Sequence, residues 1–237
     1  MDKVVALLCN YEHHEYIEQA YRSLINQSYE NLEIIVIDDG SSVSPWDYIE
    51  KVDTKGRKVT RVSNESNKGK WFCLNKAIAS TNAEWFMIQD ADDFAFPWKV
   101  RVQMNALKAT KTLLNLAGYV PIDAQGIHLS PPMPSLHDVV TIVGDEIMNS
   151  AVMSLQNPMI NHNYTGQHEI HNGASMFHRN MHDIGFRFHP PGQGLRIARS
   201  EDSDYNLRAT LLFGRTSWTP LKCYSYRLGS GHPEGSF

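Results

Sequence analysis

Three carboxylates lie within four residues of this chain, in the segment Asp90-Ala91-Asp92-Asp93. They follow residues 84–89, an apolar stretch typical of a buried strand. Because neighbouring carboxylates repel one another, the cluster indicates a cation or several hydrogen-bond donors between them. Mg²⁺ and Mn²⁺ prefer such oxygen ligands and take their remaining ligands from phosphates and water. The alternative is that these residues only occupy a helix N-terminus.

A second acidic segment, Asp38-Asp39-Gly40-Ser41-Ser42, follows another apolar stretch at residues 32–37. A strand-end carboxylate such as Asp39 can accept a hydrogen bond from a nucleobase N–H group. Asp-Gly after a strand is also ordinary turn chemistry. Two such clusters after two strands favour one shared site, because ligands of open parallel sheets bind beyond the carboxyl ends of the strands.

The apolar pattern alternates between strand and helix through the first half of the chain. Residues 3–9 form a continuous run typical of a central parallel strand, and residues 15–26 show helical spacing. This alternation predicts an α/β fold with an open, mostly parallel sheet. The pattern is weak over 118–158 and predicts a loop from 227 onward. The other predicted elements are strands at 32–37, 59–62, 84–89 and 173–178 and helices at 71–80, 97–112 and 203–212.

Composition and length describe an ordinary globular protein. The formal net charge of -4 gives no general attraction to nucleic acid or to anionic lipid. The three cysteines do not outline a disulfide framework, and no run approaches the ~20 apolar residues that a membrane helix needs. The first residues do not have the pattern of a signal peptide, so we expect a cytoplasmic protein without a transmembrane segment.

A series of short motifs links the two acidic clusters. They are Tyr11, Tyr16-Ile17, Ser23-Leu24, Gln27-Ser28-Tyr29, residues 31–42, Asn67-Lys68-Gly69, residues 74–78, residues 90–93 and Pro97. Together they resemble the nucleotide-sugar domain of family 2 glycosyltransferases, which has the GT-A fold. The resemblance implies a single Rossmann-like GT-A domain over residues 1–237. Residues 1–105 would be its nucleotide-sugar-binding half, and residues 106–237 would be a smaller acceptor-binding half that ends in a C-terminal loop.

The resemblance also implies where a donor nucleotide binds. Tyr11 and Asp39 match the positions that hold the nucleobase, usually uracil, and Lys70 lies in the loop that closes over it. Asp90 matches the carboxylate near the ribose. The family commonly has Asn where this chain has Glu12, which leaves that contact open. The predicted nucleotide-binding residues are Tyr11, Glu12, Asp39, Lys70, Asp90 and Ala91.

A metal site and a general base are implied in the same way. Asp92 matches the carboxylate that binds Mn²⁺ or Mg²⁺ on the diphosphate, and Asp93 supports that site. Some GT-A enzymes add a histidine from a C-terminal loop, here His232, for which a plain surface position is the alternative. Glu201 and Asp202 resemble the acidic motif that opens a helix and supplies the base of inverting members. Asp202 is the candidate base and Glu201 its substitute, with helix capping as the alternative role.

These residues predict an inverting glycosyltransferase that moves a sugar from a UDP-sugar, or another nucleotide-sugar, to an acceptor hydroxyl. Asp202 would take the hydroxyl proton as the bond to the diphosphate breaks. The acceptor is left open among a glycan, a lipid-linked sugar, a protein and a modified nucleobase. One alternative is a catalytically inactive nucleotide-sugar-binding relative. Another is a Mg²⁺-dependent nucleotidyltransferase, which would need a glycine-rich basic loop that residues 11–15 do not supply.

Overall fold

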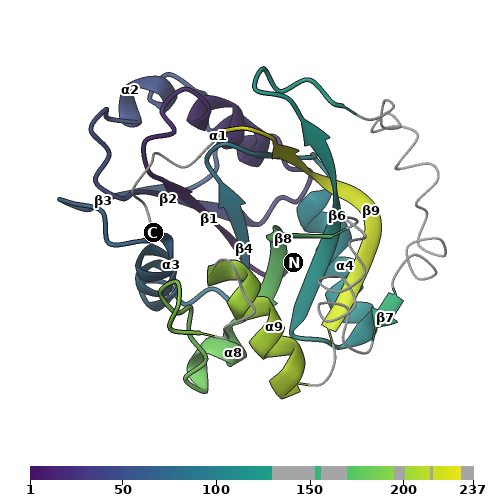
Figure 1. The fold of residues 1–237 in the computed structure, drawn as a ribbon. Coiled ribbons are helices and arrows are strands. Elements are labelled where there is room, and N and C mark those ends of the chain that lie inside the picture. The colour runs from purple at the N-terminus through teal and green to yellow at the C-terminus, as the bar shows by residue number, and fades with distance from the viewer. Residues whose placement is uncertain (130–152, 156–169, 195–200, 214–215, 231–237) are drawn as a thin grey trace.

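The fold is that of a computed structural model, which describes residues 1–129, 153–155, 170–194, 201–213 and 216–230 (Figure 1). Its strands are β1 (Val4–Asn10), β2 (Leu32–Asp38), β3 (Val59–Ser63), β4 (Trp85–Asp90), β5 (Phe94–Ala95), β6 (Leu114–Ile122), β7 (Met153–Leu155), β8 (Ile170–His178) and β9 (Thr216–Arg227). Its helices are α1 (Ile17–Ile25), α2 (Trp46–Ile49), α3 (Lys70–Ala79), α4 (Lys99–Thr110), α8 (Arg179–Asp183) and α9 (Glu201–Phe213).

The strands form one sheet in the order β3-β2-β1-β4-β8-β6-β9-β5, with β7 paired to β9. The neighbours from β3 to β4 are parallel, and so are β6 and β9. Strand β8 runs antiparallel to both β4 and β6, so β6 and β9 run in the direction of β4. The carboxyl ends of β1, β2, β4, β6 and β9 therefore lie along one edge of the sheet. This arrangement confirms the predicted α/β fold with a mostly parallel sheet.

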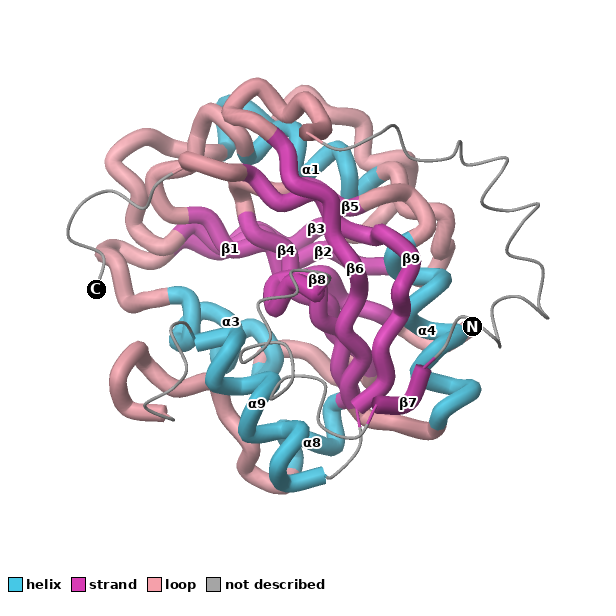
Figure 2. Tube along the Cα trace, turned by 45° about the vertical axis from the view of Figure 1, so that its right-hand side comes forward, coloured by secondary structure: helices cyan, strands magenta, loops and turns pink. Residues whose placement is uncertain are grey.

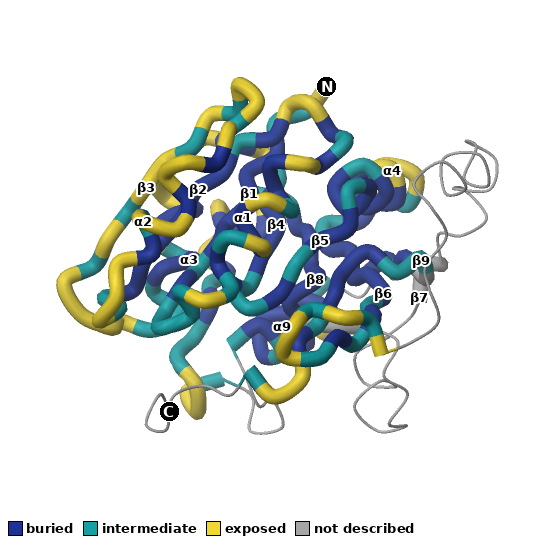
Figure 3. The backbone as a smooth tube through the Cα atoms, turned by 90° about the horizontal axis from the view of Figure 1, so that it is seen from above, coloured by how far each residue is buried: buried dark blue, intermediate teal, exposed yellow. Residues whose placement is uncertain are grey.

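Helices cover both faces of the sheet, which explains the continuous apolar sequence of β1. Val5 and Leu7 pack in a core that also contains residues of α3, α8 and α9. Val4, Ala6 and Leu8 face the opposite core, to which α1, α2 and α4 contribute. Helices α3, α8 and α9 lie together on one side in Figure 2, and the central strands β1 and β4 are buried in Figure 3. A strand buried on both faces needs apolar side chains at every position.

Two long strands, β6 and β9, were absent from the elements that the sequence pattern predicts. Both carry buried polar residues where a core strand usually has apolar ones, and their pairing shifts register twice near Gly118. The Asn115 amide donates to Ser217 Oγ at 2.9 Å, and Thr219 Oγ1 donates to Asn115 Oδ1 at 3.2 Å. These side chains form their hydrogen bonds with one another only after the two strands pair. For that reason no local apolar pattern indicates β6 or β9.

The helix predicted at 97–112 is shorter in the structure. Helix α4 begins at Lys99 with Trp98 as its N-cap residue, so Pro97 precedes the helix and does not lie in its first turn. The Pro97 carbonyl instead accepts a hydrogen bond from Ser28 N at 2.7 Å, which joins this segment to the end of α1.

Among the helices that the structure describes, none has the length and apolar character that a membrane crossing requires.

Candidate functional site

The two acidic clusters lie on either side of the end of β1, at the carboxyl edge of the sheet. In the pairing register, Asn10 at the end of β1 is opposite Asp38 of β2, and Cys9 is opposite Asp90 of β4. The last residues of β2 and β4 therefore flank the end of β1. The shared edge that the sequence predicts is the one that the structure forms.

Glu12 stabilises the turn that follows β2. Its carboxylate accepts hydrogen bonds from Ser42 N at 2.7 Å and from Ser42 Oγ at 2.8 Å, and its own N–H donates to Ser41 Oγ. Gly40 in this turn has φ 76°, and a Cβ there would lie 2.6 Å from the Ser66 backbone, so only glycine fits. In the structure Glu12 contacts this turn, and its contact with a nucleobase stays a prediction. Tyr11 lies half-buried beside it in the loop after β1.

Asp39 is buried and holds the loop that leads into α3. Its Oδ1 accepts from Asn64 Nδ2 at 2.8 Å and from Lys68 N at 3.0 Å, and its Oδ2 accepts from Gly69 N at 2.8 Å. The Cys73 thiol is a fourth hydrogen-bonding partner of Asp39, and a carboxylate has about four acceptor positions. Asp39 therefore shapes the loop, and its contact with a nucleobase stays a prediction.

Asp39→Ala is expected to weaken both folding and nucleotide binding. Three donors lose a charged acceptor, so the free energy of unfolding should fall by about 2 to 4 kcal/mol. Loss of one hydrogen bond to a nucleobase should lower UDP affinity by about tenfold. Urea denaturation and calorimetry measure the two effects, with Asp47→Ala at an exposed position of α2 as the control. Unchanged UDP affinity would mean that Asp39 only shapes the loop.

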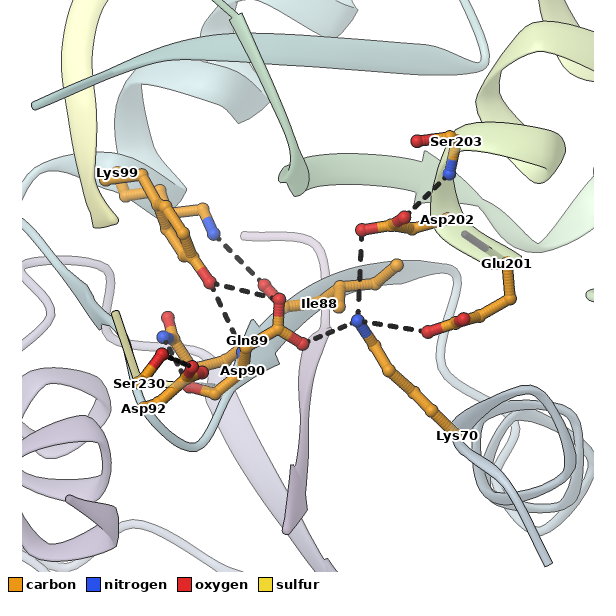
Figure 4. A network of polar contacts seen from close by, with 11 residues as sticks. Lys70, Ile88, Gln89, Asp90, Asp92, Lys99, Glu201, Asp202, Ser203 and Ser230 are labelled. Atoms are coloured by element: carbon orange, nitrogen blue, oxygen red, sulfur yellow. Dashed lines mark hydrogen bonds and ion pairs between the residues drawn. The ribbon is translucent and has the colours of Figure 1, made fainter. Parts of the chain in front are cut away.

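Lys70 contacts carboxylates from both halves of the chain. Its Nζ lies 2.6 Å from Asp90 Oδ1, 3.4 Å from Glu201 Oε1 and 3.8 Å from Asp202 Oδ2 (Figure 4). Burial by itself lowers the pKa of the Lys70 ammonium, but the three carboxylates outweigh it and hold that pKa well above its ordinary value. The ammonium is therefore charged and bridges the end of β4 to the start of α9.

The position of Lys70 corrects one sequence prediction. The resemblance placed Lys70 in a loop, whereas the structure makes it the first residue of α3. Gly69, with φ 89°, is the N-cap residue, and its carbonyl accepts from the N–H groups of Phe72 and Cys73. Because the backbone is helical from Lys70 onward, the side chain projects from a fixed helix end toward Asp90.

Asp202 is buried in the first turn of α9, with an exposed fraction of 6%. Its Oδ1 accepts from Ser203 N at 2.7 Å, while its Oδ2 is the atom that faces Lys70. The two oxygens thus have different surroundings, one at the helix backbone and one in the ion-pair network. Glu201 is less buried and contacts the same ammonium.

Arg227, at the end of β9, fixes the Asp92-Asp93 segment. Its backbone N donates to Asp93 Oδ1 at 2.7 Å, and its Nε donates to the Asp92 carbonyl at 2.6 Å. The guanidinium also donates to the carbonyls of Asp123 and Ala124 and to Gln19 Oε1. One buried side chain therefore joins the acidic loop, residues 90–93, to the turn after β6 and to helix α1.

Arg227→Lys is expected to lower the free energy of unfolding by about 2 to 4 kcal/mol. An ammonium cannot reproduce the planar set of guanidinium donors, so several buried carbonyls lose their partner. Chemical denaturation measures the change. Arg22→Lys is the matched control, because Arg22 is exposed on α1 and forms one ion pair with Glu18. Equal stability of the two variants would show that the Arg227 hydrogen bonds contribute little.

The predicted metal residues Asp92 and Asp93 differ in burial and in their contacts. Asp93 is buried, and its pKa is raised well above the ordinary value by burial and then by the carboxylates of Asp92 and Asp90. Asp92 is half-buried, and its Oδ2 accepts from Ser230 Oγ at 2.6 Å. Asp93 therefore faces the protein, and Asp92 is the more accessible carboxylate. His232 lies outside the residues that the structure describes.

A divalent ion fits this donor set only together with a ligand phosphate. The described residues contain no group of three or more His, Cys, Asp or Glu side chains that could hold a metal. Mg²⁺ and Mn²⁺ sites on nucleotides typically use one or two carboxylates and complete their coordination with phosphates and water. Asp92 meets that requirement in oxygen type and in accessibility. Ala91 is buried in a hydrophobic core, so only its backbone could face a ligand.

Sequence reasoning missed the residues that lie beneath Asp90. The Asp90 backbone N donates to the Tyr224 hydroxyl at 3.3 Å, and that hydroxyl is 3.5 Å from Asp90 Oδ2. The buried Lys99 ammonium lies 4.5 Å from the centre of the Tyr224 ring, and burial lowers the pKa of Lys99 to about 7. Tyr224 belongs to β9, which has no local signal, and Lys99 reads as one polar residue within a helix. Neither could be found from spacing.

Comparisons with known proteins find similar sequences. The sequence profile described as Glycosyl transferase family 2 matches residues 5–182. An uncharacterized glycosyltransferase of Haemophilus influenzae is 32% identical over 119 residues, 50% of this chain and 37% of that protein. The Escherichia coli UDP-Glc:alpha-D-GlcNAc-diphosphoundecaprenol beta-1,3-glucosyltransferase WfaP is 26% identical over 135 residues, 56% of this chain and 53% of that protein. The matched region thus spans about a third to a half of these curated relatives.

Solved structures share the fold at low sequence identity. The structure of S. aureus TarS residues 1–349 in complex with UDP-GlcNAc has a TM-score of 0.68 and 16% identity, and the match covers 97% of this chain and 60% of TarS 1–349. The complex of the same protein with UDP has a TM-score of 0.66 at the same identity and covers 95% of this chain. This likeness shows the GT-A fold.

Proposed function

This chain belongs to glycosyl transferase family 2, and we propose that it transfers a sugar from a UDP-sugar to an acceptor hydroxyl with inversion at the anomeric carbon. The observation that supports this best is the convergence of Asp90, Glu201 and Asp202 on Lys70. It brings the carboxylate assigned to the donor next to the carboxylate assigned to the base. We further propose that residues 1–105 bind the nucleotide-sugar and residues 106–237 bind the acceptor.

UDP is the proposed nucleotide of the donor. Two complexes of TarS, which shares this fold, contain UDP or UDP-GlcNAc, and the E. coli relative is named for UDP-Glc. Tyr11 and Asp39 would contact the base, and Asp90 would contact the ribose. This placement uses the carboxyl edge of the sheet, where ligands of open α/β sheets bind.

Mn²⁺ or Mg²⁺ is the proposed cofactor, with Asp92 as its protein ligand and Asp93 as the support beneath it. When bound, such an ion stabilises the negative charge of a diphosphate leaving group. Asp93 is fixed by the Arg227 N–H. When an ion binds Asp92, the Ser230 hydroxyl would have to share the Asp92 carboxylate with it or move away. The acidic loop is thus held in place by β9 before any ion arrives.

Asp202 is the proposed general base. Its Oδ2 faces the network beside Asp90, so it could take the proton of an acceptor hydroxyl that attacks the donor sugar. Its Oδ1 stays on the N–H of Ser203, which fixes the carboxylate at the start of α9. One carboxylate base opposite the leaving group is enough for inversion.

A lipid-linked sugar is the acceptor class that we favour among the four that the sequence leaves open. The E. coli relative is named for a GlcNAc-diphosphoundecaprenol acceptor. A purified chain should release UDP from UDP-glucose or UDP-GlcNAc when a sugar-diphosphate-lipid acceptor is added. Release only with a soluble glycan or a protein would change the acceptor class. Binding of UDP-sugars without turnover on any acceptor would identify an inactive relative.

A further inference from the structure

We infer that Tyr224 is a positioning residue of the donor site, whose buried hydroxyl sets the orientation of Asp90 while Lys99 holds the Tyr224 ring. The inference rests on the proposed function, because the donor role of Asp90 comes from it. Tyr224 lies on β9 and is 134 positions from Asp90 in the sequence. The C-terminal strand would thereby determine how well the first half of the chain binds its ligand.

The geometry around Asp90 holds its two carboxylate oxygens from different elements. Lys70 of α3 contacts Oδ1 at 2.6 Å (Figure 4). The Tyr224 hydroxyl lies 3.5 Å from Oδ2, at the long limit of a hydrogen bond. The same hydroxyl accepts the Asp90 backbone N–H at 3.3 Å. A carboxylate that is held at both oxygens and at its own backbone has little freedom to rotate.

The Tyr224 hydroxyl also contacts Asp93, at the other end of the acidic loop. The Tyr224 side chain hydrogen-bonds Asp93, whose Oδ1 accepts from Arg227 N. Because a hydroxyl has one proton, the Asp90 and Asp93 carboxylates share it. Asp90 and Asp93 flank the Ala91-Asp92 segment. One buried hydroxyl thus stabilises both ends of the short segment that carries the proposed metal ligand.

Lys99 provides the other half of this support. It is completely buried, its Nζ donates to the Ile88 carbonyl at 3.1 Å, and it lies 4.5 Å from the centre of the Tyr224 ring. Within the described part of the chain, Lys99 forms no ion pair with a carboxylate. Burying a lysine costs free energy. The Lys99 side chain over the ring face fixes the plane of the ring, and its charged form gains a cation–π contact that compensates part of that cost.

Packing alone does not account for the hydroxyl. A phenylalanine would fill the same volume, and a buried hydroxyl is unfavourable unless it is hydrogen-bonded. The partners found for the Tyr224 hydroxyl are groups of the acidic loop. Its removal should therefore affect the ligand of that loop more than it affects the fold.

Tyr224→Phe in the full chain tests this inference. We expect the Kd for UDP and the KM for the donor to rise three- to tenfold, with kcat within about twofold of the wild type. Tyr29→Phe is the matched control, because Tyr29 is also buried and its hydroxyl donates to the Asp2 carbonyl at 2.7 Å, at the other end of β1. That variant should leave both donor constants unchanged.

A second variant tests the same inference without changing Tyr224. Lys99→Met removes the cation over the ring and should raise the donor KM in the same direction. Donor constants of Tyr224→Phe equal to those of the wild type would overturn the inference while leaving the proposed function intact. Equal losses in Tyr224→Phe and Tyr29→Phe would also overturn it. A wild-type chain that binds no UDP would overturn the proposed function and this inference with it.

Discussion

Replacing Asp202 by Asn is expected to lower turnover by about 10²- to 10⁴-fold, the usual effect of removing a general base, while donor binding survives. The structure separates the two roles of this side chain. An Asn side-chain oxygen can still accept the Ser203 N–H that Asp202 Oδ1 accepts. Stability should therefore change little. The other oxygen, which faces Lys70, loses its basicity.

Glu201→Gln is the matched control for this prediction. Glu201 contacts the same Lys70 ammonium at 3.4 Å and lies in the same helical turn, so the two variants disturb the ion-pair network to a similar degree. Steady-state rates at saturating donor, with UDP affinity from calorimetry, compare them. A near-wild-type rate for Asp202→Asn with a large loss for Glu201→Gln would transfer the role of base to Glu201.

Asp92→Ala should abolish the metal-dependent part of UDP binding and lower turnover by at least about 10²-fold, because an ion on a diphosphate contributes several kcal/mol to leaving-group stabilisation. Thermal unfolding with UDP, with and without Mn²⁺, measures the first effect, and EDTA should reproduce it in the wild type. Ser230→Ala is the control. It removes the hydroxyl from Asp92 Oδ2 but keeps the carboxylate, so metal dependence should remain.

Equal stabilisation of the wild type and Asp92→Ala by Mn²⁺ with UDP would remove Asp92 from the proposed metal site. The ligand would then have to be Asp90, which Lys70 already pairs at 2.6 Å. A divalent ion at Asp90 would displace that ammonium. In that case Lys70→Met should strengthen Mn²⁺ binding, whereas it has no such effect if Asp92 holds the ion.

The first half of the fold could be predicted because its signals are local. The apolar runs at β1, β2 and β4 are continuous, and each of the last two ends directly on acidic residues. Strand ends and parallel pairing then place Asp38 and Asp90 at one edge. The acidic start of α9 was also visible, since Glu201 and Asp202 precede a helical segment.

The remainder depends on contacts between residues far apart in the sequence. Strands β6 and β9 bury polar side chains such as Asn115 and Ser217 that form hydrogen bonds across the two strands, so apolar periodicity does not reveal them. Because β9 was missing, the positions of Tyr224 and Arg227 beneath the acidic loop could not be foreseen. The motif position of Lys70 was known, but its partners Glu201 and Asp202 follow from the topology.

Thermal unfolding of the wild-type chain with nucleoside diphosphates and Mn²⁺ tests most directly whether this edge of the sheet is a UDP-sugar site. A ligand at 100 times its Kd stabilises the native state by about 2.7 kcal/mol. For a chain of this length that corresponds to a rise in Tm of roughly 5 to 11 °C. We expect this rise for UDP with Mn²⁺ and a smaller one for UDP with EDTA. The absence of any shift with UDP, with or without the metal, at concentrations up to several millimolar would contradict it.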